Sequence, residues 1–347
     1  MNPNRPITLL WSLRSLCDLA CPSCYFGDPL IHQVKPPTKT GQLSHISPHD
    51  LKRREVLAFT RTLKYSAVGR IFVAGGEPLN WPGILDTLKI IKDAGIEVIV
   101  CTNGIPLNRP VLLQSLLDLG IDAFSVSLDS TEAEFNDWMR PDPKGKHGWQ
   151  DVVDGIRALI AARTEGGPRV GLYTVITRRN IEQVPAMGRF AAELGADYYV
   201  PQPIALAEDH PHHAELSLRP DDTSALTDAF AELYAADLSL TLPEGSYPGQ
   251  VIAGVPRTTS TAAGCFGGRT LHFIQPDGAI WDCVSSLRID ATPASAHRTI
   301  RGHSAADLFP APTGCASDCP LASYECVNMW PLMGFDRILT PTARSAA

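Results

Sequence analysis

The stretch RIFVAGGEPLNWPGILDTLKIIKDAG, residues 70–95, places a short apolar run directly before a helical pattern. After its first residue, the segment 70–75 is continuously apolar and ends on glycine, which is typical of a strand buried on both faces. Residues 81–95 space their apolar side chains three and four positions apart and close on Gly95, which predicts an amphipathic helix. The stretch therefore predicts one strand–helix unit of a parallel α/β fold.

The same alternation repeats from the beginning of the chain to about residue 240. Strands are predicted at residues 7–13, 70–75, 97–104, 122–129, 169–177 and 196–205. Helical patterns follow them at residues 49–66, 81–95, 109–120, 148–166, 181–195 and 219–238. Six such units are too few for a closed eight-fold barrel, so we predict an α/β fold that is a partial (β/α)6 TIM-like barrel, with a small C-terminal cysteine-rich extension. In such folds the chemistry takes place at the carboxyl ends of the strands.

The composition excludes several classes of function. The 347 residues are 44% hydrophobic and 19% charged, and their formal net charge of −7 comes without a basic stripe suited to nucleic acid. The N-terminus has no signal-peptide pattern, and no run approaches the about 20 apolar residues that span a bilayer. We therefore expect a soluble, cytoplasmic protein that binds neither nucleic acid nor a membrane. Its nine cysteines are expected to be metal ligands rather than disulfides.

Three cysteines follow the first strand, in the segment CDLACPSCYF at residues 17–26. Thiolates are soft ligands that favour zinc or an iron–sulfur cluster. A structural zinc site needs four protein ligands, whereas this segment supplies Cys17, Cys21 and Cys24. A catalytic cluster with one iron left open fits three thiolates better, and a zinc site completed by His32 is the alternative.

The spacing Cys17-x3-Cys21-x2-Cys24 after the first strand resembles the motif that defines the radical S-adenosylmethionine (SAM) superfamily. The resemblance extends from residue 7 to about residue 205. It implies that the three thiolates hold a [4Fe–4S] cluster whose open iron binds the amino and carboxyl groups of SAM. It further implies reductive cleavage of SAM to a 5′-deoxyadenosyl radical, which takes a hydrogen atom from the substrate. A reductase such as flavodoxin or ferredoxin is the implied electron donor.

Segments after later strands resemble the SAM-binding motifs of this superfamily. The segment AGGEP contains two glycines that permit close approach to a ligand and a glutamate that can accept from an ammonium group. SVSLD ends the fourth strand, TVITRRNI ends the fifth, and WMRP carries an arginine common in this branch. Relatives usually carry a large side chain just before the third cysteine, where this chain has Ser23. The resemblance implies these cofactor-binding residues: Gly75, Gly76, Glu77, Pro78, Ser125, Ser127, Asp129, Arg140 and Asn180.

A second cysteine group lies near the C-terminus and contains Cys265, Cys283, Cys315, Cys319 and Cys326. The first two flank a predicted hairpin with a Pro-Asp-Gly turn. The pattern resembles the extensions called SPASM and twitch, and it implies one auxiliary [4Fe–4S] cluster held by the first two cysteines and two of the other three. A four-cysteine zinc ribbon is the alternative. We expect a barrel domain at residues 1–240, a linker at 241–264, the auxiliary-cluster domain at 265–335 and a tail at 336–347.

Two further features lie at the expected active end of the barrel. Cys101 ends the apolar run EVIVC and is either a buried core thiol or a hydrogen-atom donor that faces the active site. The segment AEDHPHHAEL, residues 207–216, places three histidines beyond the sixth strand. Contact with the substrate and no functional role are the two interpretations of these histidines.

The resemblance leaves the substrate open. Many relatives with such an extension modify peptides through a leader-binding domain ahead of the barrel, whereas Cys17 lies close to Met1. We therefore predict a small-molecule substrate, a sugar or sugar-nucleoside in antibiotic biosynthesis, with decarboxylation similar to that of cytosylglucuronate decarboxylases. Oxidation or epimerisation of a sugar alcohol and peptide maturation are the enzymatic alternatives. An iron–sulfur electron carrier and a zinc-binding protein are the non-enzymatic ones.

Overall fold

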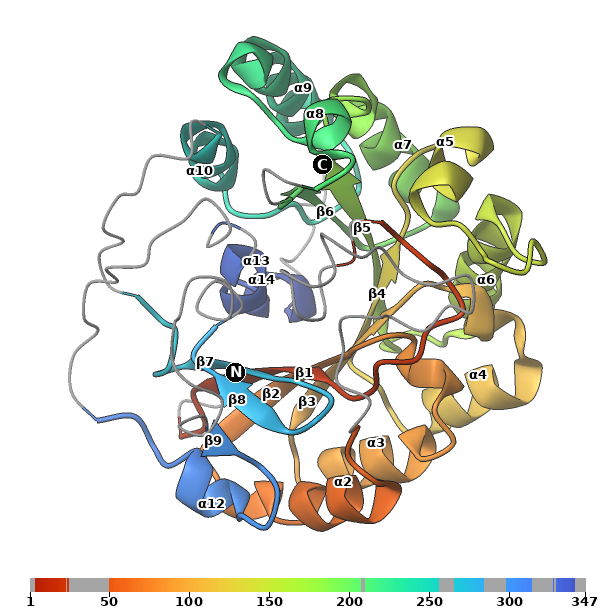
Figure 1. The fold of residues 1–347 in the computed structure, drawn as a ribbon. Helices are drawn as coiled ribbons and strands as arrows, with labels where there is room; N and C mark the ends of the chain where they lie inside the picture. The colour runs from red at the N-terminus through yellow and green to blue at the C-terminus, as the bar shows by residue number, and fades with distance from the viewer. Residues whose placement is uncertain are drawn as a thin grey trace.

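The barrel is built from parallel strands that pair in the order of the chain. A computed structural model describes residues 4–22, 24, 50–206, 210–255, 265–283, 298–313, 327 and 329–340. The parallel strands are β1 (Ile7–Ser12), β2 (Val68–Ala74), β3 (Glu97–Thr102), β4 (Ala123–Ser127), β5 (Arg169–Ile176) and β6 (Tyr198–Pro203). Helices cover the outer face of the curved sheet, while its inner face surrounds a bore (Figure 1). The predicted partial (β/α)6 barrel is therefore confirmed.

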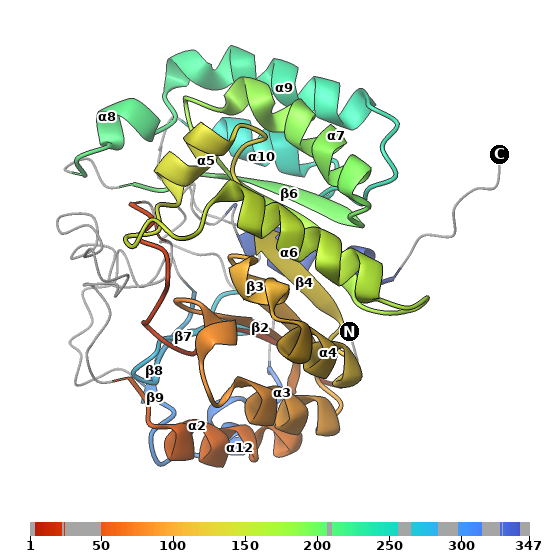
Figure 2. The ribbon, with the colours of Figure 1, turned by 90° about the vertical axis from the view of Figure 1, so that its right-hand side faces the viewer.

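The helices predicted from the sequence form the outer layer, which Figure 2 shows from the side. They are α2 (Arg53–Thr60), α3 (Ile84–Asp93), α4 (Pro110–Asp118), α6 (Trp149–Ala162), α7 (Val184–Leu194) and α9 (Thr223–Ala235). In α3 the buried Ile84, Leu88 and Ile91 lie on one face, and Gly95 ends the turn with a φ of +70°. Not predicted were α5 (Ala133–Met139), α8 (His213–Leu216) and the 3₁₀ turns η2 (Pro78–Asn80) and η3 (Ile105–Asn108). The 3₁₀ turns η1 (Leu63–Tyr65), η4 (Ile181–Gln183) and η5 (Pro220–Asp222) lie within ranges predicted to be helical.

The C-terminal extension continues the barrel sheet. Strand β7 (Leu271–Ile274) pairs in parallel with β1, and β8 (Ala279–Trp281) and β9 (Arg298–Thr299) follow antiparallel. The strand order among the described residues is β6-β5-β4-β3-β2-β1-β7-β8-β9. Gly278 makes the predicted hairpin turn with a φ of +91°. The short helix α12 (Ala305–Leu308) then packs beside η1.

The bore of the barrel is filled by the end of the chain. Helices α13 (Trp330–Met333) and α14 (Asp336–Leu339) lie inside the ring of strands (Figure 1). Phe335 is fully buried between Phe72 and Tyr198, with ring centroids 5.0 and 5.5 Å away in edge-to-face contact. The fully buried Arg70 pairs with Asp336 at 2.5 Å and with a glutamate of β3. Residues 336–339, expected to belong to a tail, form α14, whose Ile338 is buried in the core.

The segment expected to be a linker also contains regular structure. Helix α10 (Tyr247–Gly254) lies within it, so the expectation of an irregular linker is wrong for these residues. Tyr247 and Val251, one helical turn apart, are both buried, and the hydroxyl of Tyr247 donates to the carbonyl of Pro201 at 2.8 Å. Pro248 is compatible with this helix because it falls in the first turn.

A buried histidine in the hairpin of the extension is expected to make the protein sensitive to acid. His272 of β7 is 3% exposed, lies 5.0 Å from the ring of Phe309, and has its Nδ1 3.4 Å from Arg298. Burial, followed by the charge of Arg298, lowers the pKa of His272 to about 4. The unfolded chain therefore binds a proton that the folded chain does not between about pH 6.5 and pH 4.

We expect the free energy of unfolding to fall as the pH falls through this window. Below about pH 4 the loss caused by His272 reaches about 3 kcal/mol. His272→Gln removes the titration and should flatten the dependence of the unfolding free energy on pH, measured by urea unfolding. His303→Gln, at an exposed position, should leave the dependence unchanged. Equal losses in wild type and His272→Gln would show that this histidine does not cause the acid sensitivity.

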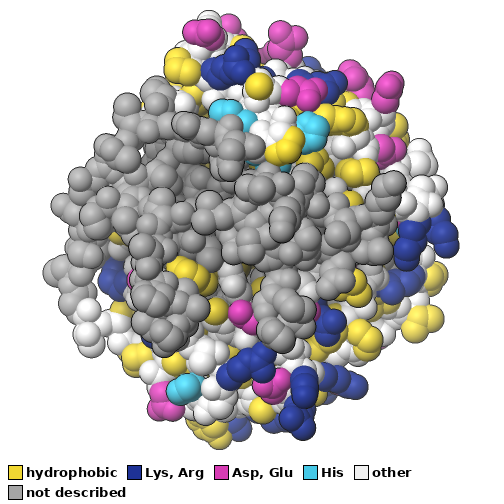
Figure 3. All heavy atoms as spheres, in the orientation of Figure 1, with side chains coloured by type: hydrophobic (Ala, Val, Ile, Leu, Met, Phe, Trp, Pro, Cys, Tyr) yellow, Lys and Arg dark blue, Asp and Glu magenta, His cyan; other side chains and the backbone are white. Residues whose placement is uncertain are grey.

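Charged side chains of both signs are spread over the face shown in Figure 3. No helix in the described part of the chain is long and apolar enough to span a membrane.

Candidate active site

A cavity of about 190 Å³ lies among the carboxyl ends of the parallel strands. The loop after β1, residues 13–22 and 24, is called the cysteine loop here and forms one wall. Every strand from β1 to β6 contributes to the lining or is followed by residues that do. The sequence-predicted residues in the lining are Cys17, Cys21, Cys24, Gly75, Gly76, Cys101, Ser125, Ser127, Asp129 and Arg140. Residues far apart in the sequence thus meet at the predicted end of the barrel.

Polar contacts hold the cysteine loop against the neighbouring strand ends. Asp18 accepts hydrogen bonds from the side-chain amides of Asn80 at 2.9 Å and Asn103 at 2.5 Å. The N–H of Ala20 donates to the carbonyl of Pro141 at 2.8 Å. These contacts fix the loop to the ends of β2, β3 and α5.

Gly75 and Gly76 are required by the packing of the backbone. A Cβ on Gly76 would lie 2.1 Å from the carbonyl oxygen of Leu16, and one on Gly75 would lie 2.6 Å from that of Arg14. Gly75 also has a φ of +135°, which side chains rarely adopt. The sequence suggested that these glycines allow a ligand to approach the backbone closely. The structure shows that they allow the cysteine loop to do so.

The thiols of the cysteine loop are half-buried, and Cys17 lies close to negative charge. Burial, then the neighbouring Cys21, Asp18 and Glu77, raises the pKa of Cys17 well above its ordinary value. Burial also raises the pKa of Cys21, although the charge of Arg140 opposes this. These thiols are therefore neutral unless a cation compensates their charge.

Glu77 is buried and caps the short η2 turn. One carboxylate oxygen accepts from the N–H of Leu79 at 3.0 Å and the hydroxyl of Thr102 at 2.9 Å, and the other accepts from the N–H of Asn103 at 2.8 Å. Burial outweighs these donors and raises the pKa of Glu77 to about 8. Glu77 and Pro78 do not belong to the described lining of the cavity.

Asp129 and Arg140 form a buried, bidentate ion pair on the cavity wall. Their atoms approach to 2.7 Å (Nε to Oδ2) and 3.1 Å (Nη2 to Oδ1), and Asp129 also accepts from the N–H of Val175 at 2.8 Å. Burial alone would lower the pKa of Arg140, but the charges of Asp129 and the cysteines hold it above its ordinary value. The arginine is therefore permanently charged next to the cysteine loop.

Asn180 supports this pair instead of lining the cavity. Its amide nitrogen donates to the carbonyls of Asp129 at 2.9 Å and Val175 at 3.0 Å. Its oxygen accepts from both the N–H and the hydroxyl of Thr177. All four hydrogen-bonding positions of the amide are therefore used within the chain. This geometry favours a structural role for Asn180 over the predicted contact with SAM.

Cys101 lies on the cavity wall beside a group of hydroxyls. Ser125, its partner across the β3–β4 register, lies 2.8 Å from the hydroxyl of Tyr198. That tyrosine donates to the carbonyl of Phe124 at 2.8 Å. Burial, then the charge of Glu77, raises the pKa of Cys101 to about 12. The thiol therefore keeps its hydrogen at neutral pH.

The described half of the second cysteine group is compact. A Cβ on Gly267 would lie 3.5 Å from both the sulfur of Cys265 and the Cβ of Cys283, so both side chains flank this glycine. The N–H of Gly267 donates to the sulfur of Cys265 at 3.3 Å. The remaining predicted ligands, Cys315, Cys319 and Cys326, lie outside the described residues, as do His32 and Ser23.

Several lining residues were missed by sequence reasoning. Thr102, Asn103 and Gln202 follow from the rule that active residues lie at strand ends, and the TNG segment after β3 carried that signal. Met329 and Leu332 carried no signal, because they reach the cavity from the end of the chain.

The three thiols of the cysteine loop fit an iron–sulfur cluster. They share one cavity wall, and the N–H of Leu19 donates to the sulfur of Cys17 at 3.4 Å, an interaction that tunes such clusters. In the described part of the chain, no three Cys, His, Asp or Glu side chains converge as the ligands of a single metal ion do. A cubane cluster does not need that convergence, because each thiolate binds a different iron.

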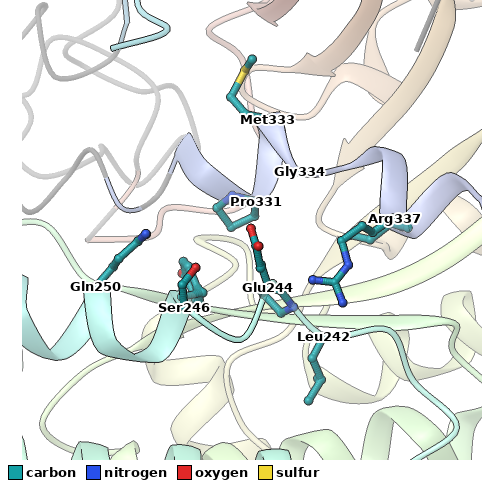
Figure 4. A pocket seen from close by; sticks show the side chains of 11 residues that line it. Leu242, Glu244, Ser246, Gln250, Pro331, Met333, Gly334 and Arg337 are labelled. Atoms are coloured by element: carbon teal, nitrogen blue, oxygen red, sulfur yellow. The ribbon is translucent and has the colours of Figure 1, made fainter. Parts of the chain in front are cut away.

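A second cavity, of about 230 Å³, lies between α10 and the C-terminal helices. Figure 4 shows Glu244 and Arg337 on facing sides of it, with Pro331 and Met333 above. Because Leu332 lines the first cavity and Met333 the second, α13 separates the two.

Residues 12–191 match the family model described as the radical SAM superfamily. This match covers just over half of the chain and includes the cysteine loop, so the chain belongs to the radical SAM superfamily. Members of this superfamily are enzymes that bind a [4Fe–4S] cluster and SAM, and homologues with a SPASM-type extension carry auxiliary clusters.

The individual relatives differ in how much of the chain they match. The AdoMet-dependent heme synthase of Methanosarcina barkeri is 27% identical over 196 residues, which are 56% of this chain and 50% of that protein. The mycofactocin maturase MftC of Mycobacterium tuberculosis is 26% identical over 295 residues, 81% of this chain and 65% of that protein. The structure of Streptococcus suis SuiB bound to the precursor peptide SuiA superimposes with a TM-score of 0.63 at 16% identity, over 88% of this chain and 65% of SuiB. The chain thus spans about half to two thirds of these relatives, and the structural likeness shows the fold.

Proposed function

We propose that this chain is a radical SAM enzyme that takes a hydrogen atom from an apolar or aromatic side chain of a peptide. The observation that carries this proposal is an apolar wall in the lining of the cavity. Leu10 and Phe72 supply it from β1 and β2, and Met329 and Leu332 supply it from the C-terminal segment. Such a wall accepts a hydrocarbon side chain at little desolvation cost, whereas sugar hydroxyls would lose hydrogen bonds to water there.

The relatives support the same class of substrate. MftC is named a mycofactocin maturase, and SuiB has been crystallised with a precursor peptide. The match to MftC extends over much more of this chain than the match to the heme synthase. The sequence-based prediction of sugar decarboxylation stays a prediction, because polar side chains such as Ser125, Ser127 and Gln202 also line the cavity. A sugar is therefore the competing outcome of the experiment below.

The residues of the cavity have distinct tasks in this proposal. Cys17, Cys21 and Cys24 would hold the cluster, and the Asp129–Arg140 pair would keep a fixed charge pattern beside it. When bound, cluster and SAM supply a 5′-deoxyadenosyl radical that removes one hydrogen atom from the substrate. The apolar wall excludes water and other hydrogen donors from the reacting carbon. A flavodoxin- or ferredoxin-type protein is proposed as the electron donor.

Cys101 is proposed to return a hydrogen atom where the reaction ends without net oxidation of the substrate. A thiolate has no hydrogen atom to give, and the raised pKa of Cys101 keeps the S–H bond intact. Transfer of this atom forms a C–H bond and leaves a sulfur radical. One electron from the reductase and one proton from solvent then restore the thiol.

The experiment compares two panels of deuterated compounds. One contains short peptides with side-chain-deuterated Val, Leu, Phe or Tyr, and the other contains deuterated sugar acids and nucleosides. The reconstituted, reduced protein is incubated with SAM and each compound, and 5′-deoxyadenosine is analysed by mass. We expect deuterium from the peptide panel.

The matched variants are Leu332→Trp and Met333→Trp, neighbours on α13 of which Leu332 lines the first cavity and Met333 lines the second. Leu332→Trp should displace the deuterated side chain of the substrate peptide and reduce deuterium transfer about tenfold or more. Met333→Trp should leave the transfer unchanged. Deuterium from the sugar panel alone would overturn the proposal. For reactions in D₂O that return hydrogen to the substrate, Cys101→Ala should stop solvent deuterium from entering the product, and unchanged incorporation would remove Cys101 from the mechanism.

A further inference from the structure

A histidine from beyond β6 contacts the cysteine loop. His210 is 3% exposed, and its Nε2 lies 3.1 Å from the carbonyl oxygen of Pro22, the residue after Cys21. Its Nδ1 accepts the N–H of His212 at 3.1 Å. A carbonyl can only accept and a backbone N–H can only donate, so the two contacts assign the neutral ring with its hydrogen on Nε2.

The segment that carries His210 is fixed to the barrel wall. The ring of His212 packs edge-on against Trp138 of α5, with centroids 5.5 Å apart. The guanidinium of Arg179 lies 4.7 Å from the same indole ring. Glu215 of α8 pairs with Arg179 at 2.7 Å and approaches His212 at 3.5 Å. The segment that carries His210 is therefore held in place by contacts with α5 and with Arg179. Figure 2 shows α8 beside α5.

The same helix α5 holds the cysteine loop on the other side of Cys21. Pro141, just after α5, accepts the N–H of Ala20, and His210 donates to the carbonyl of Pro22. The backbone is thus hydrogen-bonded immediately before and immediately after Cys21. Because a proline has no N–H, its carbonyl is the one backbone group through which this position can be held.

We propose that His210 is a positioning residue for the cluster, holding the backbone at Pro22 so that the thiolate of Cys21 faces the cavity. This inference rests on the proposed role of Cys17, Cys21 and Cys24 as cluster ligands. Groups that orient metal ligands typically change metal affinity strongly when they are removed, although they never touch the metal.

The variants separate the hydrogen bond from the shape of the ring. His210→Phe keeps a ring and loses both nitrogens. If His210→Phe does not fold, His210→Ala repeats the test. His210→Gln keeps an N–H donor that can reach Pro22. His212→Phe is the matched control, because it keeps the packing on Trp138 and the backbone N–H that bonds to His210.

The first measurement uses the protein without iron. Iodoacetamide alkylation of each cysteine is followed by peptide mass spectrometry, with Cys101, in the same cavity but on β3, as the internal reference. We expect Cys21 to react about tenfold faster in His210→Phe than in wild type, and Cys101 to react at an unchanged rate. His210→Gln should restore the slow rate, and His212→Phe should resemble wild type.

The second measurement uses the reconstituted protein. The rate of iron loss to a chelator should rise about tenfold in His210→Phe, and the electron paramagnetic resonance (EPR) signal of its reduced cluster should broaden, with recovery of both in His210→Gln. Equal alkylation and equal iron loss in His210→Phe and wild type would overturn this inference. A wild-type protein that assembles no iron at the cysteine loop would instead overturn the proposed function, and the alkylation rates would still decide the role of His210.

Discussion

Simultaneous replacement of Cys17, Cys21 and Cys24 by alanine is expected to remove one entire cluster and all cleavage of SAM. Wild type should bind about eight irons after anaerobic reconstitution, four in each of two cubane clusters, and the triple variant about four. The physical reason is that the three half-buried thiols are the soft ligands on this wall of the cavity and no cluster can form there without them. Iron and sulfide analysis, with 5′-deoxyadenosine quantified by chromatography, measures both effects.

Cys101→Ala is the matched control, because this thiol lines the same cavity from a strand instead of the loop. It should leave the iron content unchanged. The assignment fails if the triple variant retains the iron content of wild type or continues to form 5′-deoxyadenosine. Zinc in place of iron and sulfide in wild type would support the zinc alternative.

Asp129→Asn is expected to cause the largest loss of stability among single substitutions in the cavity. Asp129 and Arg140 have side chains that are 2% and 14% exposed, so the substitution leaves a buried arginine without its counter-charge. Removing one partner of a buried pair costs about 3 kcal/mol or more. Urea unfolding of the protein without cofactors measures the difference in the free energy of unfolding.

Two further variants show whether the unpaired charge is the cause. Asp154→Asn breaks an exposed pair with Arg157 and should change stability by no more than about 0.5 kcal/mol. Adding Arg140→Met to Asp129→Asn removes the buried charge altogether and should recover part of the loss. A double variant as unstable as Asp129→Asn would show that lost packing or the bond to Val175, and not the charge, explains the effect.

The barrel could be predicted because its signals are local. Each of β1 to β6 is a short apolar run, and each following helix repeats its apolar residues every three to four positions. Helix α5 was missed because it is seven residues long and buries little beyond Phe135 and Met139. The pairing of β7 with β1 and the burial of Phe335 in the bore depend on contacts between distant segments, which no local pattern encodes.

In the candidate site, too, features with a local sequence signal were predicted, and features that depend on contacts between distant residues were not. The cysteine spacing predicted one wall of the cavity, and the resemblance of SVSLD to a SAM-binding motif predicted Ser125, Ser127 and Asp129. The side chains of Glu77 and Asn180 were expected to meet SAM, but each is hydrogen-bonded to neighbouring groups of the chain. The contact from His210 to Pro22 spans 188 positions, so the three histidines gave no sign of it in the sequence.

The central claim is that three thiols hold a cluster with one iron left for SAM. The most direct measurement records the EPR spectrum of the reduced, reconstituted protein before and after SAM is added, and then quantifies methionine and 5′-deoxyadenosine. We predict that SAM changes the spectrum of a cluster that is absent from the triple cysteine variant, and that both products appear in equal amounts. A spectrum indifferent to SAM, with neither product formed, would contradict the claim.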